Sequence, residues 1–288
     1  MRYLDPKNDL PFKRIFGEHP HLCMSLLNSL LPLNANNPII ELEYLSPELV
    51  PEIPILKRTI VDVRCKDKSG RQFIVEMQMY WTESFKSRVM FNASKAYVKQ
   101  LLTTQNYNLL QPVYVLSLVN EDFEHQIPEY YHHYSMVHSL HSDKQIKGLE
   151  LVFVELQKFK AKNLRDKKLQ VLWLRFLTEI DNQSEDIPSE FIDDATIHEA
   201  LNCLETNSYT KEELDHYDRF WDSIITEKSS FTDAEERGRK DGVTEGKIEG
   251  KLEREIEIAK KALSKGMDIE VIIDLTGLSA DEINKLKD

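Results

Sequence analysis

The sequence has few cysteines, no long apolar run and fewer positive than negative charges. Its 288 residues include three cysteines, none in a CxxC pair, which argues against a disulfide framework or a cysteine-based zinc site. No apolar stretch approaches the roughly 20 residues of a membrane helix. The charged segment MRYLDPKNDLPFKRIFG lacks the apolar centre of a signal peptide. These absences predict a cytoplasmic protein without a membrane segment.

The charge balance limits the possible partners. The formal net charge is −12, within a composition of 30% charged and 41% hydrophobic residues that is typical of a globular protein. Phosphate binding needs a local excess of lysine and arginine. Any contact with nucleic acid therefore has to come from a basic patch.

Proline and glycine divide the chain into unlike parts. All eleven prolines lie at or before Pro188, while six of the nine glycines lie at or after Gly238. The region from about residue 163 to residue 228 has a helical pattern rich in Leu and Trp. We therefore predict a mixed core at 1–160, a helical extension at 161–232 and a tail at 233–288.

The core pattern predicts a helix, three strands, a second helix and further strands. The opening PFKRIFGEHPHLCMSLLNSLL has helical spacing interrupted around Gly17 and Pro20, and IIELEYLSPEL alternates as a strand does. The hairpin TIVDVRCKDKSGRQFIVEMQMY precedes the helical TESFKSRVMFNASKAYVKQLL. The apolar runs QPVYVLSLVN and LELVFVEL predict two more strands, the second near residues 149–156.

The hairpin carries polar residues inside two apolar runs. Because side chains alternate along a strand, Glu76 and Gln78 share one face with Asp62 and Arg64. The apolar face comprises Val61, Val63, Cys65, Phe73, Val75, Met77 and Met79. A three-residue loop with Gly70 in the left-handed position predicts pairs whose residue numbers add up to 138. Asp62 would then face Glu76, with their Cβ atoms roughly 5 Å apart.

Two carboxylates at this distance repel each other unless a proton or a cation lies between them. A hard divalent cation such as Mg²⁺ takes oxygen ligands and would stabilise the pair. The Gln78 amide would then orient a water or a phosphate oxygen. The alternative is a solvated face on which Arg64 pairs with one acid, and on spacing alone both interpretations stay open.

The hairpin and its neighbours resemble a known family. VDVRCKDKSGRQFIVEMQ resembles the D-x(n)-E-x-Q signature of the PD-(D/E)XK nuclease superfamily, and more closely its Rpn branch of recombination-promoting nucleases and transposases. NDLPFKRIFG, FKSRVMFNASKAYVKQL, YNLLQPVYVLSLVN and LELVFVELQKF resemble the helices and strands around it. The resemblance covers roughly residues 1–160 and the tail 233–288. It implies an α/β restriction-endonuclease-like core with a helical extension and a C-terminal helical tail.

The resemblance also implies roles for single residues. Asp62 and Glu76 would bind Mg²⁺ or Mn²⁺, Gln78 would stand in place of the usual lysine, and Asp9 matches an accessory polar position. Val61 replaces the nominal proline of the motif. Because Gln78 carries no charge, neutralising the transition state would fall more heavily on the metal and on other cations.

The helix after the hairpin offers such cations. At 100° per residue, Arg88, Lys95 and Lys99 share a stripe with Asn92, and the opposite side is apolar. We predict that the three basic residues contact DNA phosphates. The alternative is an ordinary solvated helix face.

Three further patterns carry predictions. His132, His133, His138 and His141 cluster in PEYYHHYSMVHSLHSD, and a shared helix face for His138 and His141 would suit zinc, although a structural or surface role is favoured. In the tail, four glycines recur every fourth residue from Gly238, which predicts a marginal helix or a tether. MDIEVIIDLTGLSADEINKLK then predicts a helix-turn-helix, which reads DNA or joins copies of the chain.

Taken together, the sequence predicts a Mg²⁺- or Mn²⁺-dependent endonuclease acting on double-stranded DNA and linked to recombination or mobile elements. The tail, with a net charge of −2 over its last 38 residues, favours homo-oligomerisation over DNA binding. The alternative function is a catalytically inactive nuclease fold that works as an oligomerisation or regulatory module.

Overall fold

The computed structural model describes residues 3–49, 59–101, 104–162 and 168–286. Its contacts divide the chain into two units, Met1–Ile224 and Ile225–Asp288. Within the described residues, no helix combines the length and the apolar character that crossing a membrane requires.

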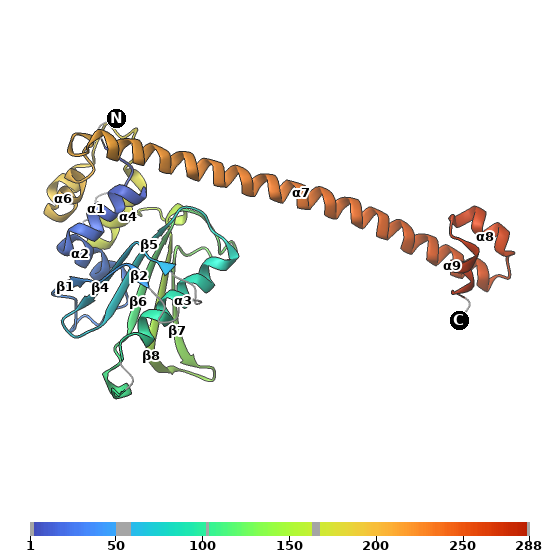
Figure 1. Ribbon diagram of the computed structural model, residues 1–288, viewed down its shortest axis with the longest axis horizontal. Coiled ribbons are helices and arrows are strands. Elements are labelled where there is room, and N and C mark those ends of the chain that lie inside the picture. The colour runs from blue at the N-terminus through green and yellow to red at the C-terminus, as the bar shows by residue number, and fades with distance from the viewer. Residues whose placement is uncertain (1–2, 50–58, 102–103, 163–167, 287–288) are drawn as a thin grey trace. The chain divides into compact units, whose positions relative to one another are not determined.

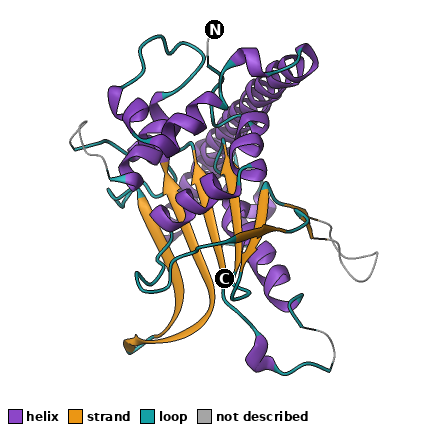
Figure 2. Cartoon of the chain, turned by 90° about the vertical axis from the view of Figure 1, so that its left-hand side faces the viewer, coloured by secondary structure: helices purple, strands orange, loops and turns teal. Residues whose placement is uncertain are grey.

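The first unit is built on a six-stranded sheet in the order β1-β4-β5-β6-β8-β7 (Figures 1 and 2). The strands are β1 Leu42–Tyr44, β4 Val63–Asp67, β5 Gln72–Gln78, β6 Val113–Val119, β7 Tyr131–His138 and β8 His141–Glu155. β1, β4 and β5 are antiparallel neighbours, and β6 and β8 run parallel to β5. A separate pair, β2 Glu48–Leu49 and β3 Thr59–Ile60, forms a two-stranded sheet. This order confirms the predicted α/β core.

Helices cover both faces of the sheet (Figure 1). One face packs on α1 (Asp9–Glu18), α2 (Pro20–Leu30) and α4 (Leu169–Glu179), and together they bury most of the apolar core. The other face packs on α3 (Glu83–Val98). The remaining elements of this unit are η1 Tyr107–Leu109, η2 Leu156–Lys158, α5 Ser189–Asp193, α6 Ala195–Asn202 and η3 Thr206–Ser208. Because β5 and β6 are covered on both sides, a polar residue on them is buried unless it lies near a strand end.

The hairpin register is the predicted one. Val63 pairs with Val75 and Arg64 with Ile74, so the numbers of each pair add up to 138. Gly70 has φ +87°, the left-handed conformation that the three-residue loop requires. The turn is also fixed by Asp67, whose carboxylate accepts hydrogen bonds from Ser69 and Arg71 and forms a 2.6 Å ion pair with the Arg71 guanidinium.

Three local predictions are wrong. Val61 does not share the face of Val63, because Asp62 lies in a bend before β4 and Val61 packs in the core under α3. His138 and His141 do not share a helix face either: they pair across the turn of the β7–β8 hairpin, and β8 begins at His141 rather than near residue 149.

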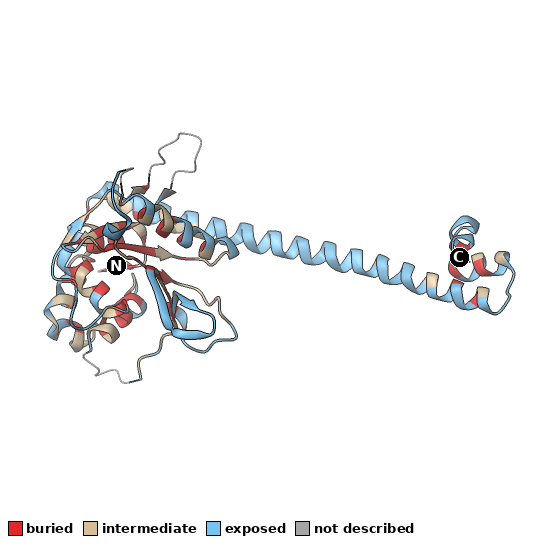
Figure 3. Cartoon of the chain, turned by 90° about the horizontal axis from the view of Figure 1, so that it is seen from below, coloured by how far each residue is buried: buried red, intermediate tan, exposed pale blue. Residues whose placement is uncertain are grey.

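The helix α7 (Lys211–Ser264) continues from the first unit into the second. Residues 225–254 are exposed along it (Figure 3), and a Cβ added at Gly238, Gly242, Gly246 or Gly250 would meet no described atom within 4 Å apart from the helix's own nearby backbone. The second unit ends with α8 (Ile269–Thr276) and α9 (Ala280–Asn284), which bury a small core with the end of α7. Gly277, at φ +74°, ends α8, and Ser279 and Glu282 form the predicted capping box.

Candidate active site at the carboxyl end of strand β5

The predicted site residues come from three elements. Asp62 precedes β4, Glu76 and Gln78 end β5, and Arg88 lies on α3. Strand β5 is central in the sheet, so Glu76 is only 6% exposed, while Gln78 is half-buried at the strand end. The site therefore lies where a buried strand emerges beside a helix.

Asp62 is held by the backbone of the neighbouring strand. Its Oδ2 accepts a hydrogen bond of 2.7 Å from the Met77 N–H. The regular ladder ends at Val63 and Val75, so the predicted direct pairing of Asp62 with Glu76 is absent from it. The two carboxylates nevertheless interact, because the charge of Asp62 raises the pKa of Glu76.

Glu76 is a buried acid with one oxygen unsatisfied. Its Oε1 accepts a 3.1 Å hydrogen bond from the Asn92 amide, and its Oε2 has no hydrogen-bond partner among the described residues. Burial, followed by the charge of Asp62, raises the pKa of Glu76 to about 7, against the opposing effects of Asn92 and Arg88. Without a cation, the protonated and the ionised forms of Glu76 are therefore both populated near pH 7.

Helix α1 contributes two further charges. Burial raises the pKa of Asp62; Asp9 adds to that rise, whereas Lys13 and Arg88 oppose it. Asp9 and Lys13 form a 2.7 Å ion pair one helical turn apart. The sequence interpretation named Asp9 but missed Lys13, although the i, i+4 spacing after a candidate site acid was visible.

Gln78 and Arg88 are in direct contact. An Arg88 Nη donates to Gln78 Oε1 at 2.5 Å, and the Gln78 amide donates to the Tyr80 carbonyl at 2.7 Å. Arg64 instead donates to Gln72 and to the Ser46 carbonyl. The alternative in which Arg64 neutralises one of the acids is therefore wrong.

The structure does not bring Lys95 and Lys99 to the acids. Lys95 donates to the Leu49 carbonyl and lies over the Phe91 ring, and no hydrogen bond among the described residues joins it to Asp62 or Glu76. Lys99 follows the end of α3, where the next residue, Gln100, bonds the Gln111 backbone just before β6. Lys99 thus lies near the amino ends of the parallel strands β5 and β6, whereas Gln78 lies at the carboxyl end of β5.

Asn92 is the residue that the helix pattern misplaced. The pattern put it on the basic and polar stripe with Arg88, Lys95 and Lys99, but it is 1% exposed and packs in the layer between α3 and the sheet. Its burial follows from the way α3 packs against β5, which the helix pattern does not contain.

The donor set suits a hard divalent cation. The described residues contain no cluster of three or more His, Cys, Asp and Glu side chains that could hold a metal. Mg²⁺ needs only one or two carboxylates, because waters and substrate phosphates complete its octahedral shell. Asp62 and Glu76, with the unsatisfied Oε2, match that requirement.

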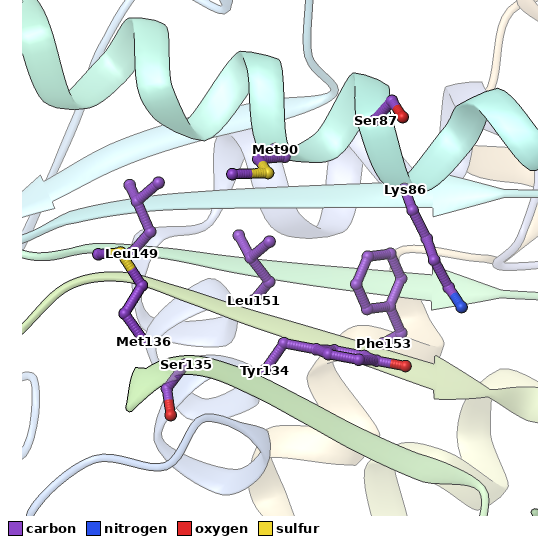
Figure 4. A pocket seen from close by; sticks show the side chains of 9 residues that line it. All are labelled: Lys86, Ser87, Met90, Tyr134, Ser135, Met136, Leu149, Leu151 and Phe153. Atoms are coloured by element: carbon purple, nitrogen blue, oxygen red, sulfur yellow. The ribbon is translucent and has the colours of Figure 1, made fainter. Parts of the chain in front are cut away.

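Two other features lie apart from this site. An apolar cavity of about 320 Å³ opens between α3 and the β7–β8 hairpin, lined by residues such as Met90, Tyr134 and Leu151 (Figure 4). None of the site acids lines it. His132 and His133 bond Glu155 and Glu150 at 2.7 and 2.6 Å, contacts that tie β7 to β8 and suit the favoured structural role.

Comparison with known families decides the class. The family described as PD-(D/E)XK nuclease family transposase matches residues 6–233, well over half of the chain. The chain belongs to this family. Its end, residues 252–288, matches the C-terminal HTH domain of the Rpn/YhgA-like nuclease family, which makes it an Rpn-type member. No curated protein and no solved structure matches the chain.

The family match agrees with the architecture. The matched region 6–233 contains the six-stranded sheet, both covering helical layers, Asp62 before β4 and Glu76 on β5. The second match covers the end of α7, α8 and α9. Both matched families are nuclease families, and the second match is an HTH domain, so the two matches suggest nuclease chemistry and DNA binding for this Rpn-type chain.

Proposed function

We propose that this Rpn-type chain is an endodeoxyribonuclease that hydrolyses phosphodiester bonds of double-stranded DNA with Mg²⁺ or Mn²⁺. The observation that carries the proposal is the Glu76 carboxylate: it is buried, close enough to Asp62 for their charges to interact, and has one oxygen without a partner among the described residues. Buried polar atoms are normally satisfied by protein, water or an ion, and a shared cation is the partner that also offsets the repulsion between two neighbouring acids.

Each residue has a definite task in this reaction. Asp62 and Glu76 would hold the cation, which when bound polarises the phosphoryl group and acidifies a water. The Gln78 amide would orient the attacking water or a phosphate oxygen, and Arg88, already bonded to Gln78, would contact the phosphate. Asp9 and Lys13 adjust the charge around Asp62.

The test is nicking of supercoiled plasmid by the full chain. We expect nicking with Mg²⁺ or Mn²⁺, none with EDTA, and none for Asp62→Ala. The matched control is Asp143→Ala, because Asp143 is an exposed acid that pairs with its neighbour Lys144. Nicking by Asp62→Ala at the wild-type rate would refute the assignment of the site.

We also propose that the tail joins copies of the chain. Apolar side chains including Ile225, Val243 and Ile248 are exposed on α7, and contact with a second copy of the chain would bury them. Light scattering on the full chain should give a multiple of the monomer mass, and Ile248→Lys should reduce it. A monomer at all concentrations would contradict this.

The exposed helix also supports the alternative function, an inactive nuclease fold that works through assembly. It would be favoured by intact oligomers with no nicking under any metal condition. A role in recombination or mobile elements, a cytoplasmic location and the division into 1–160, 161–232 and 233–288 stay predictions.

A further inference from the structure

Asn92 stands out in the layer between α3 and the sheet. Its neighbours there are apolar and include Ile74, Val89 and Ala93. Burying an amide in such a layer costs roughly 1–3 kcal/mol unless its hydrogen bonds are made. The Asn92 Nδ2 donates to Glu76, but its Oδ1 is buried without a partner among the described residues. The bond to Glu76 is therefore the contact that explains this residue.

Asn92 is one half of a clamp on β5. Arg88 contacts Gln78, and Asn92, one turn later on α3, contacts Glu76, two residues earlier on the strand. Four residues of helix rise roughly 6 Å and two residues of strand roughly 6.6 Å. The two elements therefore match in spacing, and consecutive turns of α3 reach the two polar side chains that β5 points toward it.

The two carboxylate oxygens of Glu76 differ in their hydrogen bonds. Asn92 occupies Oε1, and Oε2 has no partner in the described part of the chain. Ser117 pairs with Glu76 in the parallel register of β5 and β6, but its buried hydroxyl also makes no hydrogen bond with described residues. Among these groups, Asn92 is thus the one donor that fixes the rotation of the carboxylate.

We infer that Asn92 is a positioning residue for cation binding: it holds Oε1 of Glu76 and leaves Oε2 for the ion shared with Asp62. This inference rests on the proposed function, since it assumes that Glu76 is a metal ligand. Groups that orient metal-binding side chains typically change metal affinity 10- to 100-fold when they are removed. Asn92 would orient Glu76 from helix α3, whereas Asp62 precedes β4 and Glu76 lies on β5.

The test measures Mn²⁺ binding to the full chain by isothermal titration calorimetry. Asn92→Leu keeps the side-chain volume but removes the donor, and we expect its Kd for Mn²⁺ to rise about tenfold at unchanged stoichiometry. The control is Ser94→Ala on the same helix, whose hydroxyl bonds the Met90 carbonyl and touches neither acid. Its Kd should stay within about twofold of the wild-type value.

The unchanged stoichiometry separates positioning from folding. A purely structural defect lowers the number of competent sites, whereas lost positioning moves Kd and is overcome by more metal, so Asn92→Leu should nick at close to the wild-type rate in saturating Mn²⁺. If Asn92→Leu does not fold, Asn92→Ala, which suits a helix interior, takes its place.

An unchanged Kd in the variant that folds would overturn the inference and leave the proposed function intact. Failure of the wild-type chain to bind Mn²⁺ would instead overturn the proposed function, and the inference with it. The wild-type titration distinguishes the two failures.

Discussion

Replacing Glu76 with glutamine should make the metal-free protein more stable at alkaline pH while it removes metal binding. The buried carboxylate has a pKa raised from its ordinary 4.5 to about 7. The folded state therefore holds a proton that the unfolded state releases between these values. The amide of the variant would keep an acceptor for the Asn92 Nδ2 and carry no charge.

The magnitude follows from linkage. For a group whose folded pKa is raised, the favourable contribution is complete below about pH 4.5 and is lost as pH rises through about 7. At roughly 1.4 kcal/mol per pKa unit, the loss above pH 7 is about 3 kcal/mol. Glu76→Gln should thus gain up to about 3 kcal/mol in free energy of unfolding above pH 7, and little near pH 4.

Urea unfolding in EDTA, followed by tryptophan fluorescence, measures this difference. All three tryptophans, Trp81, Trp173 and Trp221, belong to the first unit, so the signal reports on the unit that contains Glu76. Mn²⁺ at a hundred times its Kd should raise the free energy of unfolding of the wild-type chain at high pH by about 2.7 kcal/mol. The same Mn²⁺ concentration should leave the free energy of unfolding of Glu76→Gln unchanged. A stability difference that does not vary with pH would refute the reasoning.

Three single contacts carry further predictions. Arg88→Ala should reduce the nicking rate roughly a hundredfold because it removes the cation beside Gln78. Lys99→Ala, at the other end of α3, should leave the nicking rate unchanged. Equal losses in the two variants would contradict the placement of Arg88 in the site. Arg71→Met leaves the buried Asp67 without its ion pair and should lower the free energy of unfolding by about 3 kcal/mol in urea titrations, while Lys68→Met, from an exposed pair, should cost less than about 1 kcal/mol. Gly70→Ala should lower the free energy of unfolding by about 1–2 kcal/mol, because φ +87° is strained for alanine and the added Cβ would lie 3.3 Å from the Gln111 side chain. A thermal melt measures this, and an unchanged midpoint would argue against this turn.

Much of the hairpin could be predicted because its determinants are local. One glycine in a loop of fixed length sets the register from Val63–Val75 onward, and strand alternation then places Glu76 and Gln78 together. The capping box at Ser279 and the end of α8 at Gly277 are equally local, and both are confirmed. Alternation failed at Val61, where the bend at Asp62 ends the strand.

Residue type and short spacing predicted the order of the core elements and the two candidate acids. The family was indicated by the resemblance of the hairpin and its neighbours and is shown by the family match. The cations and amides that surround those acids could be assigned only from the packed fold. The helical stripe treated Arg88, Asn92, Lys95 and Lys99 alike, but packing against β5 buried Asn92 on Glu76 and brought Arg88 to Gln78. The angle at which a helix crosses a sheet depends on side chains from several elements, and periodicity along one helix does not contain it.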